Sequence, residues 1–228
     1  RLVQLNQKSK LRRTEDVFLA EGVKMFLEAP REQLQEVYVS ESFLEKCSCR
    51  EHLEEVGYEV VSDSVFSKIS DTCTPQGVLC VLKQFHYNIE EMLRDKAPLF
   101  LLLENIQDPG NLGTMLRTGE GAGVSGIIMS RDTVDLYNPK VIRSTMGSIY
   151  RVPFYYADDF AAAVHQVQQA GVSVYAAHLR GKNSYACQDY TKGTAFLIGN
   201  EGNGLREETA ELADCYIRIP MEGKVESL

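Results

Sequence analysis

The sequence predicts an α/β fold in two compact domains, and three observations lead to that prediction. The length of 228 residues is more than one domain usually needs and favours two. From residue 98 onwards, short apolar runs alternate with stretches of helical periodicity, a pattern typical of a parallel sheet covered by helices. A polar stretch, residues 86–97, precedes the first of these apolar runs. We therefore expect a small α/β domain over residues 1–85, a linker over 86–97 and a second α/β domain over 98–228.

The first domain contains alternating helical and extended patterns. Apolar residues over 18–27 predict a helix, and the β-rich residues 37–39 that follow predict a strand. Residues 41–56 are rich in Glu and Leu and predict a second helix. Two further apolar segments, 58–61 and 77–82, predict strands. These elements together make one small α/β unit.

The second domain contains five fully apolar runs of strand length. They cover residues 99–103, 126–129, 172–176, 194–198 and 216–219. Strands that are apolar throughout are buried on both faces, as they are in a parallel sheet between two layers of helices. Ligands of such sheets bind beyond the carboxyl ends of the strands, so we expect the chemistry in the loops that leave these runs.

The charge distribution leaves a nucleic-acid partner open. The formal net charge of −8 argues against phosphate binding, which depends on Lys and Arg. The first 13 residues nevertheless carry basic side chains and no acidic one, and the distribution of charge matters more than its sum. We predict Lys8, Lys10, Arg12 and Arg13 as RNA-binding residues, with a solvated basic tail as the alternative.

Composition also limits the location and the metal chemistry of the chain. Apolar residues make up 44% and charged residues 25%, as in an ordinary soluble protein, and the longest apolar run is too short to cross a bilayer. No secretory signal is visible at the N-terminus, so we expect a cytoplasmic protein without a membrane partner. The six cysteines form no CxxC pair and have no matched His spacing, so we expect neither a metal site nor disulfides.

Three loops at predicted strand ends carry polar residues suited to chemistry. The first, residues 104–118, contains an Asp-Pro-Gly-Asn turn and starts a helix whose free N–H groups could hold an anion; Arg117 follows Asn111 by six residues. The second, 199–205, has three glycines that allow close backbone approach to a ligand. The third is 220–228. Each loop alone has an ordinary explanation, as a turn or as a helix entry.

Taken together and in this order, the loops resemble a known family. DPGNLGTMLRT, IGNEGNGL and IPMEGKVESL are similar to the three motifs of the SpoU/TrmH family of RNA 2′-O-ribose methyltransferases, in the SPOUT superfamily. Residues 138–154 resemble the family's segment between the first two motifs. The match covers essentially all of residues 98–228. More weakly, LAEGVK at 19–24 resembles the ribosomal-protein-like RNA substrate-binding domain that often precedes such enzymes.

The resemblance implies a parallel sheet with a deep trefoil knot at its C-terminal end, a homodimer, and S-adenosyl-L-methionine as cofactor, with S-adenosyl-L-homocysteine as product. It implies that the knotted loops form the cofactor pocket. The implied cofactor-binding residues are Leu179, Gly199, Asn200, Gly202, Ile219, Met221 and Leu228. The family continues beyond its Ser-Leu pair with an asparagine that helps complete the active site, whereas this sequence stops one residue earlier, which implies a truncated C-terminal end.

The resemblance also implies the catalytic residues. Arg117 would act on the ribose 2′-hydroxyl, and because arginine stays protonated in proteins, we expect it to stabilise the developing alkoxide and hold the adjacent phosphate. Asn111 would orient Arg117 or the ribose, and Glu201 would position Arg117 or accept from the substrate. Ser227 would help to hold the nucleotide. The alternative for Glu201 is a carboxylate favoured by a helix N-terminus.

Other functions fit the residues less well. A dinucleotide-dependent oxidoreductase would need a GxGxxG turn after its first strand, and residues 110–113 lack the first glycine pair. A transfer-RNA methyltransferase and a non-catalytic RNA-binding protein with the same fold remain as alternatives. The leading small domain favours structured ribosomal RNA over transfer RNA as the substrate, by analogy of architecture.

Overall fold

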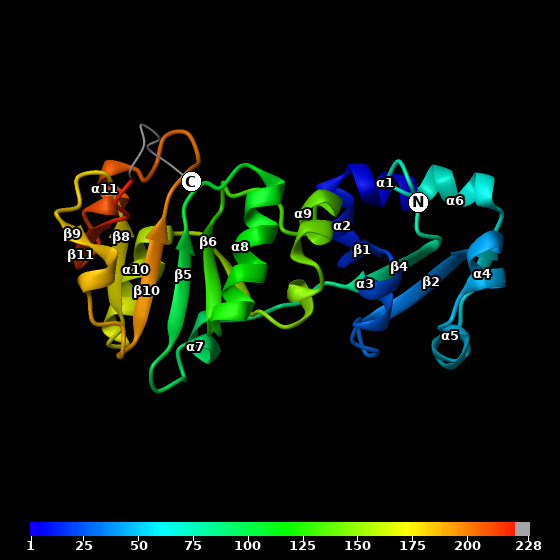
Figure 1. Cartoon of the computed structure of the whole chain (residues 1–228), viewed down its shortest axis with the longest axis horizontal. Coiled ribbons are helices and arrows are strands. Elements are labelled where there is room, and N and C mark those ends of the chain that lie inside the picture. The colour runs from blue at the N-terminus through cyan, green and yellow to red at the C-terminus, as the bar shows by residue number, and fades with distance from the viewer. Residues whose placement is uncertain (222–228) are drawn as a thin grey trace. The chain divides into compact units, whose positions relative to one another are not determined.

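The computed structural model describes residues 1–221, which fold into two compact units (Figure 1). The first unit comprises Arg1–Phe85 together with Asp135–Arg151, and the second comprises His86–Val134 and the described residues from Val152 onwards. The segment Asp135–Arg151 differs from the sequence prediction, which assigned it to the second domain. It packs with the first unit instead, because its apolar side chains enter that unit's core.

The first unit is built on a four-stranded mixed sheet with the strand order β1-β4-β2-β3. Strand β4 lies antiparallel to both of its neighbours, whereas β2 and β3 are parallel. Their bounds are β1 (Val17–Glu21), β2 (Leu34–Ser40), β3 (Glu59–Val61) and β4 (Val78–Lys83). The predicted strands at 37–39, 58–61 and 77–82 are therefore confirmed. The sheet also contains β1, which was not predicted as a strand.

Two helix predictions in the first unit are wrong in detail. Residues 17–21 form β1 rather than helix, and Gly22, at φ 113°, separates that strand from the short helix α3 (Val23–Leu27). The predicted helix over 41–56 is two helices, α4 (Glu41–Lys46) and α5 (Arg50–Val56). The remaining helices of the Arg1–Phe85 segment are α1 (Leu2–Gln7), α2 (Ser9–Glu15) and α6 (Asp63–Ile69).

The segment Asp135–Arg151 supplies α9 (Pro139–Thr145) and the 3₁₀ helix η1 (Ser148–Tyr150) to the first unit. Its Tyr137 ring lies 4.8 Å from the Phe18 ring, centroid to centroid. The buried hydroxyl of Tyr150 donates to the carbonyl oxygen of Met25 at 2.9 Å. These contacts join residues more than a hundred positions apart in the sequence, so the first unit is complete only when the later segment returns to it.

The second unit is built on a seven-stranded sheet with the strand order β7-β6-β5-β10-β8-β11-β9 (Figure 1). Every strand pair in this sheet is parallel, which confirms the predicted parallel sheet. The strands are β5 (Leu99–Leu103), β6 (Gly126–Ser130), β7 (Phe154–Ala157), β8 (Ser173–Ala177), β9 (Asn183–Ser184), β10 (Thr194–Ile198) and β11 (Cys215–Arg218). Two of them, β7 and β9, were not predicted.

Helices cover both faces of this sheet. On one face, α8 (Pro109–Ala122) packs against β5, where a Cβ on Gly119 would be in ordinary van der Waals contact with the Leu101 side chain at 3.5 Å. The opposite face carries a core of alternate strand residues with α7 (Ile89–Met92), α10 (Phe160–Gln169) and α11 (Glu207–Ala210). A further 3₁₀ helix, η2 (Tyr185–Cys187), follows β9. Helix α7 lies in the predicted linker, and its Ile89 and Met92 are buried in the second unit's core.

The strand order determines where a ligand site forms. From β5 the chain moves to β6 and β7 on one side, and the later strands β10, β8 and β11 lie on the other side. The order therefore reverses between β5 and β10, which are adjacent and parallel. In open parallel sheets, ligands bind outside the carboxyl ends of the strands at such a switch point. The loops after Leu103 and Ile198 meet at this point.

In the described part of the chain, no helix is both long and apolar enough to cross a membrane. The knot that the resemblance implies concerns the C-terminal segment, part of which lies beyond residue 221, and it stays a prediction.

Candidate functional site

The loop after β5 is shaped by local turn chemistry. Asp108 is the N-cap of α8, and its carboxylate accepts from the backbone N–H of Asn111 at 2.8 Å. Pro109 occupies the first helical turn, where its missing N–H costs nothing. Asn105, just before, adopts a left-handed conformation with φ 54°, which Asn tolerates better than most residues. The Asp-Pro-Gly-Asn sequence therefore does begin a helix at the strand end, as predicted.

Glu201 joins the loops after β5 and β10. Its carboxylate accepts from the backbone N–H groups of Gln107 at 3.1 Å and Asp108 at 3.0 Å, and from the side-chain amide of Asn111 at 3.2 Å. Partial burial raises the pKa of Glu201, but these hydrogen bonds to the charged form outweigh it and leave the pKa below its ordinary value. Glu201 is therefore a carboxylate at neutral pH.

The glycine-rich loop after β10 folds on itself around Asn200. The side-chain oxygen of Asn200 accepts from the backbone N–H groups of Gly202 and Asn203, both at 3.0 Å. Its amide nitrogen donates to the Asn105 carbonyl at 2.8 Å, which ties this loop to the loop after β5. A Cβ on Gly199 would lie 2.2 Å from the backbone of Gly204 and of Leu205. Only glycine fits at position 199.

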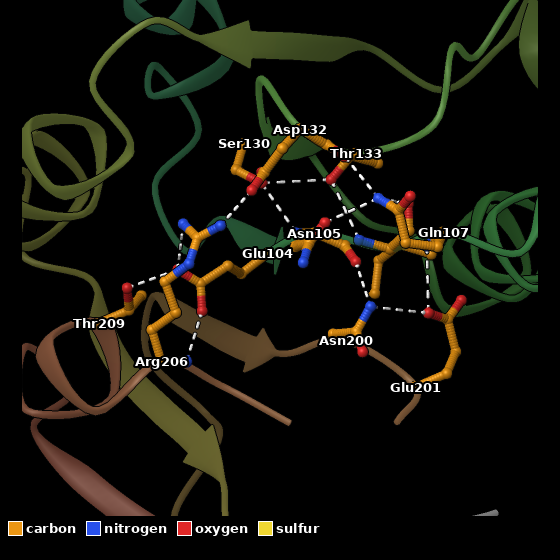
Figure 2. A network of polar contacts seen from close by, with 11 residues as sticks. Glu104, Asn105, Gln107, Ser130, Asp132, Thr133, Asn200, Glu201, Arg206 and Thr209 are labelled. Carbon is orange, nitrogen blue, oxygen red and sulfur yellow. Dashed lines mark hydrogen bonds and ion pairs between the residues drawn. The ribbon is translucent and has the colours of Figure 1, made fainter. Parts of the chain in front are cut away.

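A second polar network, shown in Figure 2, includes residues that the sequence analysis missed. Glu104 is 1% exposed, and its carboxylate accepts from the Arg206 backbone N–H at 2.8 Å and the Thr209 hydroxyl at 2.5 Å. The Arg206 guanidinium lies 3.4 Å from Glu104 and also binds Asp132. Ser130 donates to Asp132 at 2.5 Å. The network links the carboxyl ends of β5, β6 and β10.

One sequence signal could have identified Glu104. It follows directly after the five apolar residues of β5, at the end of a strand that is buried between two helical layers. A charged residue there is buried only if it is paired and hydrogen-bonded. Its partner Arg206 lies 102 positions later, which sequence spacing does not reveal.

The structure brings only some of the predicted catalytic residues together. Asn111 and Glu201 are in contact, but the six residues from Asn111 to Arg117 span about one and two-thirds helical turns, so Arg117 projects from another face of α8. Arg117 is exposed, and within residues 1–221 it makes no hydrogen bond or ion pair with either residue. Ser227 lies outside the described residues.

The predicted cofactor residues fall into two groups. Gly199, Asn200 and Gly202 form the loop at the switch point, whereas Leu179 and Met221 line a cavity of about 620 Å³ beside the ends of β8 and β11. Leu179 is 56% exposed, and Ile219, next to this cavity in the sequence, is 48% exposed. Leu228 lies outside the described residues.

These loops are suited to a nucleoside-bearing cofactor. Exposed apolar side chains at strand ends, such as Leu179 and Ile219, provide surfaces on which a purine ring can pack. At Gly199 the loop has no side chain, so a ligand can approach its backbone closely. The observed residues therefore fit the group that the resemblance implies.

The predicted RNA-binding residues do not all face solvent. Lys8, Lys10 and Arg13 are exposed on the first unit. Arg12 is 3% exposed, and its guanidinium donates to the Leu5 carbonyl at 2.6 Å and to Asp135 at 2.5 Å. The prediction for Arg12 is therefore wrong, because its charge is already paired inside the protein.

Family models match both parts of the chain. The model described as the SpoU rRNA Methylase family matches residues 98–228, and the model described as the MRM3-like substrate binding domain matches residues 1–80.

Individual relatives agree with these matches. The chain is 33% identical over 169 residues to the 23S rRNA (guanosine(2553)-2'-O)-methyltransferase RlmP of Bacillus subtilis, a match that covers 74% of this chain and 66% of that protein. The matched part is thus slightly less than two thirds of that relative. This chain is also 31% identical to the 23S rRNA (guanosine-2'-O-)-methyltransferase RlmB of Bordetella pertussis, in a match that covers 86% of this chain and 84% of that protein.

A solved structure has the same fold. The AdoMet bound rRNA methyltransferase from Sinorhizobium meliloti aligns with a TM-score of 0.83 at 30% identity, over 100% of this chain and 87% of that chain. The site at the ends of β5 and β10 lies within the region that the family model matches. Because a family model matches more than half of its residues, the chain belongs to the SpoU rRNA Methylase family.

Proposed function

We propose that the protein transfers a methyl group from S-adenosyl-L-methionine to a ribose 2′-oxygen of RNA and releases S-adenosyl-L-homocysteine. The observation that carries this proposal is the clamp in which Asn111 and two backbone N–H groups hold the Glu201 carboxylate at the switch point of the sheet. Family membership supplies the reaction class, and the clamp fixes two loops of the site against each other.

In this proposal the loop residues Gly199, Asn200 and Gly202 hold the cofactor from one side, and Leu179, Ile219 and Met221 hold it from the other. The bound cofactor supplies an electrophilic methyl group on a sulfonium. The chain's own contribution is to orient the ribose hydroxyl and to keep water away from it. Ser227 and Leu228, outside the described residues, are assigned here only by the family resemblance.

Arg117 is the residue we assign to the hydroxyl. It stays charged, so it would stabilise negative charge as the hydroxyl oxygen loses its proton and would hold a neighbouring phosphate. Its exposure leaves it accessible to RNA. The Arg117→Lys variant should lose most of its single-turnover rate, because a lysine cannot make the two parallel hydrogen bonds of a guanidinium. Retention of that rate with normal cofactor binding would exclude this role.

Ribosomal RNA is the substrate class we favour. The relatives described above are named as 23S rRNA methyltransferases, and the first 80 residues match a substrate binding domain. A solved structure that concerns the 2-OH methylation of C/U34 on tRNA aligns with 58% of this chain, with a TM-score of 0.53. We also propose that the protein forms a homodimer and is located in the cytoplasm.

Calorimetric titration with S-adenosyl-L-methionine and, separately, with NAD tests the cofactor assignment. Saturable binding of the first alone, at one site per subunit, is expected. A non-catalytic RNA-binding protein is the second candidate, and tritiated methyl incorporation into 23S rRNA transcripts separates the two functions. RNA binding without incorporation would favour the second.

A further inference from the structure

The cavity beside the ends of β8 and β11 is lined by three basic side chains. Arg180, Lys182 and Arg218 border it, and none of its described lining residues is acidic. This composition is unusual for a chain with 32 acidic and 24 basic residues and a net charge of −8. The excess of positive charge is therefore local and needs its own explanation.

Lys182 and Arg218 come from neighbouring segments at this edge of the sheet. Arg218 lies opposite Ser184 in the parallel pair of β11 and β9, and Lys182 directly precedes β9. Both residues line the same cavity. Like charges that share a cavity repel each other, and a bound anion would offset that repulsion.

A close backbone contact holds the turn that carries these residues. A Cβ on Gly181 would lie 2.8 Å from the backbone carbon of Ile217, so glycine allows this turn to pack directly against β11. The Gly181 N–H donates to the His178 carbonyl at 2.9 Å, which closes the turn. The cations of the turn and of β11 are thus brought to one cavity by packing.

The three cations differ in their partners. The Arg180 guanidinium lies 2.5 Å from both carboxylate oxygens of Glu207. For Lys182 and Arg218, no ion pair is found with any residue in the range 1–221. Arg180 is therefore partly neutralised, and the other two are the candidates for binding an anion.

The chemistry of the ligand follows from charge. S-adenosyl-L-methionine carries a sulfonium, an ammonium and a carboxylate and is a net cation, so a cluster of basic residues does not favour it. A phosphodiester is an anion that Lys and Arg bind well. Leu179 and Met221, which we assign to the cofactor, line the same cavity, so a phosphate group bound by the basic residues would lie beside the cofactor. We propose that Lys182 and Arg218 bind a phosphodiester group of the RNA substrate, an inference that rests on the proposed function.

The test compares two matched double variants of the full chain. Lys182→Gln with Arg218→Gln removes the basic pair at the cavity. Arg94→Gln with Lys192→Gln removes the same two charges from exposed positions that precede β5 and β10, at the opposite end of the parallel strands. Binding of a fluorescein-labelled hairpin transcript of 23S rRNA is measured from 50 to 200 mM salt, and cofactor binding is measured by calorimetry.

The cavity variant should bind the hairpin about tenfold more weakly and should show a shallower salt dependence, with a change of roughly 0.7 to 0.9 in the log–log slope per lost phosphate contact. Its cofactor affinity should be unchanged, and the control should match the wild type in both assays. Equal RNA binding by both variants would overturn the proposal. So would a loss confined to cofactor affinity, which would assign the cations to the cofactor carboxylate. A wild type that binds cofactor but no RNA would refute the proposed function as well.

Discussion

At the scale of single residues, Gly199 is the position at which we expect the site to tolerate least change. Any Cβ there would meet backbone atoms at 2.2 Å, and backbone cannot move aside as a flexible side chain can. Gly199→Ala should lower the free energy of unfolding by about 3 kcal/mol, near the upper end for overpacking, and should abolish calorimetric cofactor binding.

Gly202→Ala is the control for that substitution. The nearest atom to a Cβ at this position is the Asn200 side-chain oxygen at 3.6 Å, an ordinary contact. Urea unfolding should place this variant within about 0.5 kcal/mol of the wild type. Equal destabilisation by the two alanines would show that the loop is not held by the close approach at Gly199.

Glu201 should contribute a pH-dependent part of the stability. Because its hydrogen bonds lower its pKa in the folded state, its stabilisation is complete above the ordinary value of 4.5 and is lost as the pH falls through the lower folded pKa. Glu201→Gln should therefore melt at a lower temperature than the wild type at pH 7, and the difference should shrink below about pH 4.5. Scanning fluorimetry from pH 7 to pH 3 measures this; a difference independent of pH would contradict it.

At the scale of elements, Glu104 connects strand β5 to the start of α11. The carboxylate provides two oxygens for three donors, from the backbone and side chain of Arg206 and from Thr209. A glutamine offers one oxygen and turns an N–H group towards donors. Glu104→Gln should cost about 1–3 kcal/mol of stability, the range for an unsatisfied buried group, and should increase amide hydrogen exchange in residues 199–209.

Asp214→Asn provides the matched control for Glu104→Gln. Asp214 accepts from the Val174 N–H at 2.7 Å and from the Gln168 amide at 3.2 Å, at the opposite end of β8 from the site. It should lower the melting temperature while leaving exchange in residues 199–209 and cofactor affinity unchanged. If Glu104→Gln also left both unchanged, Glu104 would be a structural residue rather than a positioning one.

Elements were predictable where their signal is local. The apolar run at 99–103 has the length of a strand and ends in turn residues, and it is β5 with the same bounds. The run at 17–21 is also a strand, but Ala20 and Glu21 are common in helices, and pairing with β4 decides the outcome. The predicted helix over 41–56 is interrupted at Cys47–Cys49, and no local turn signal in the sequence indicated that interruption.

At the scale of the whole molecule, the chain leaves the second unit after Val134 and adds Asp135–Arg151 to the first. Arg12 binds this segment through Asp135 and is 3% exposed, whereas Asp135 is 29% exposed. Arg12→Met should lower the free energy of unfolding by about 2 kcal/mol, less than a fully buried pair would lose because water reaches Asp135. Urea unfolding measures the change.

Arg13→Met separates stability from RNA binding. Arg13 is exposed, and its guanidinium makes a long hydrogen bond of 3.4 Å to the Ser9 hydroxyl. This variant should unfold like the wild type within about 0.5 kcal/mol but should reduce the salt dependence of RNA binding, whereas Arg12→Met should leave that dependence unchanged. The reverse pattern would restore Arg12 as an RNA contact.

The amino-acid sequence alone was enough to predict the class of fold, five of the seven strands of the second unit and the loops that carry the chemistry. Apolar runs, turn residues and helix caps act between neighbours in the chain, so their consequences can be inferred locally. Four features became visible only in the folded chain: Glu201 contacts Asn111, Glu104 is paired with Arg206, Arg12 is buried, and residues 135–151 complete the first unit. Each of these depends on partners between 90 and 125 positions apart, and the chain brings such partners together only through its strand order and core packing.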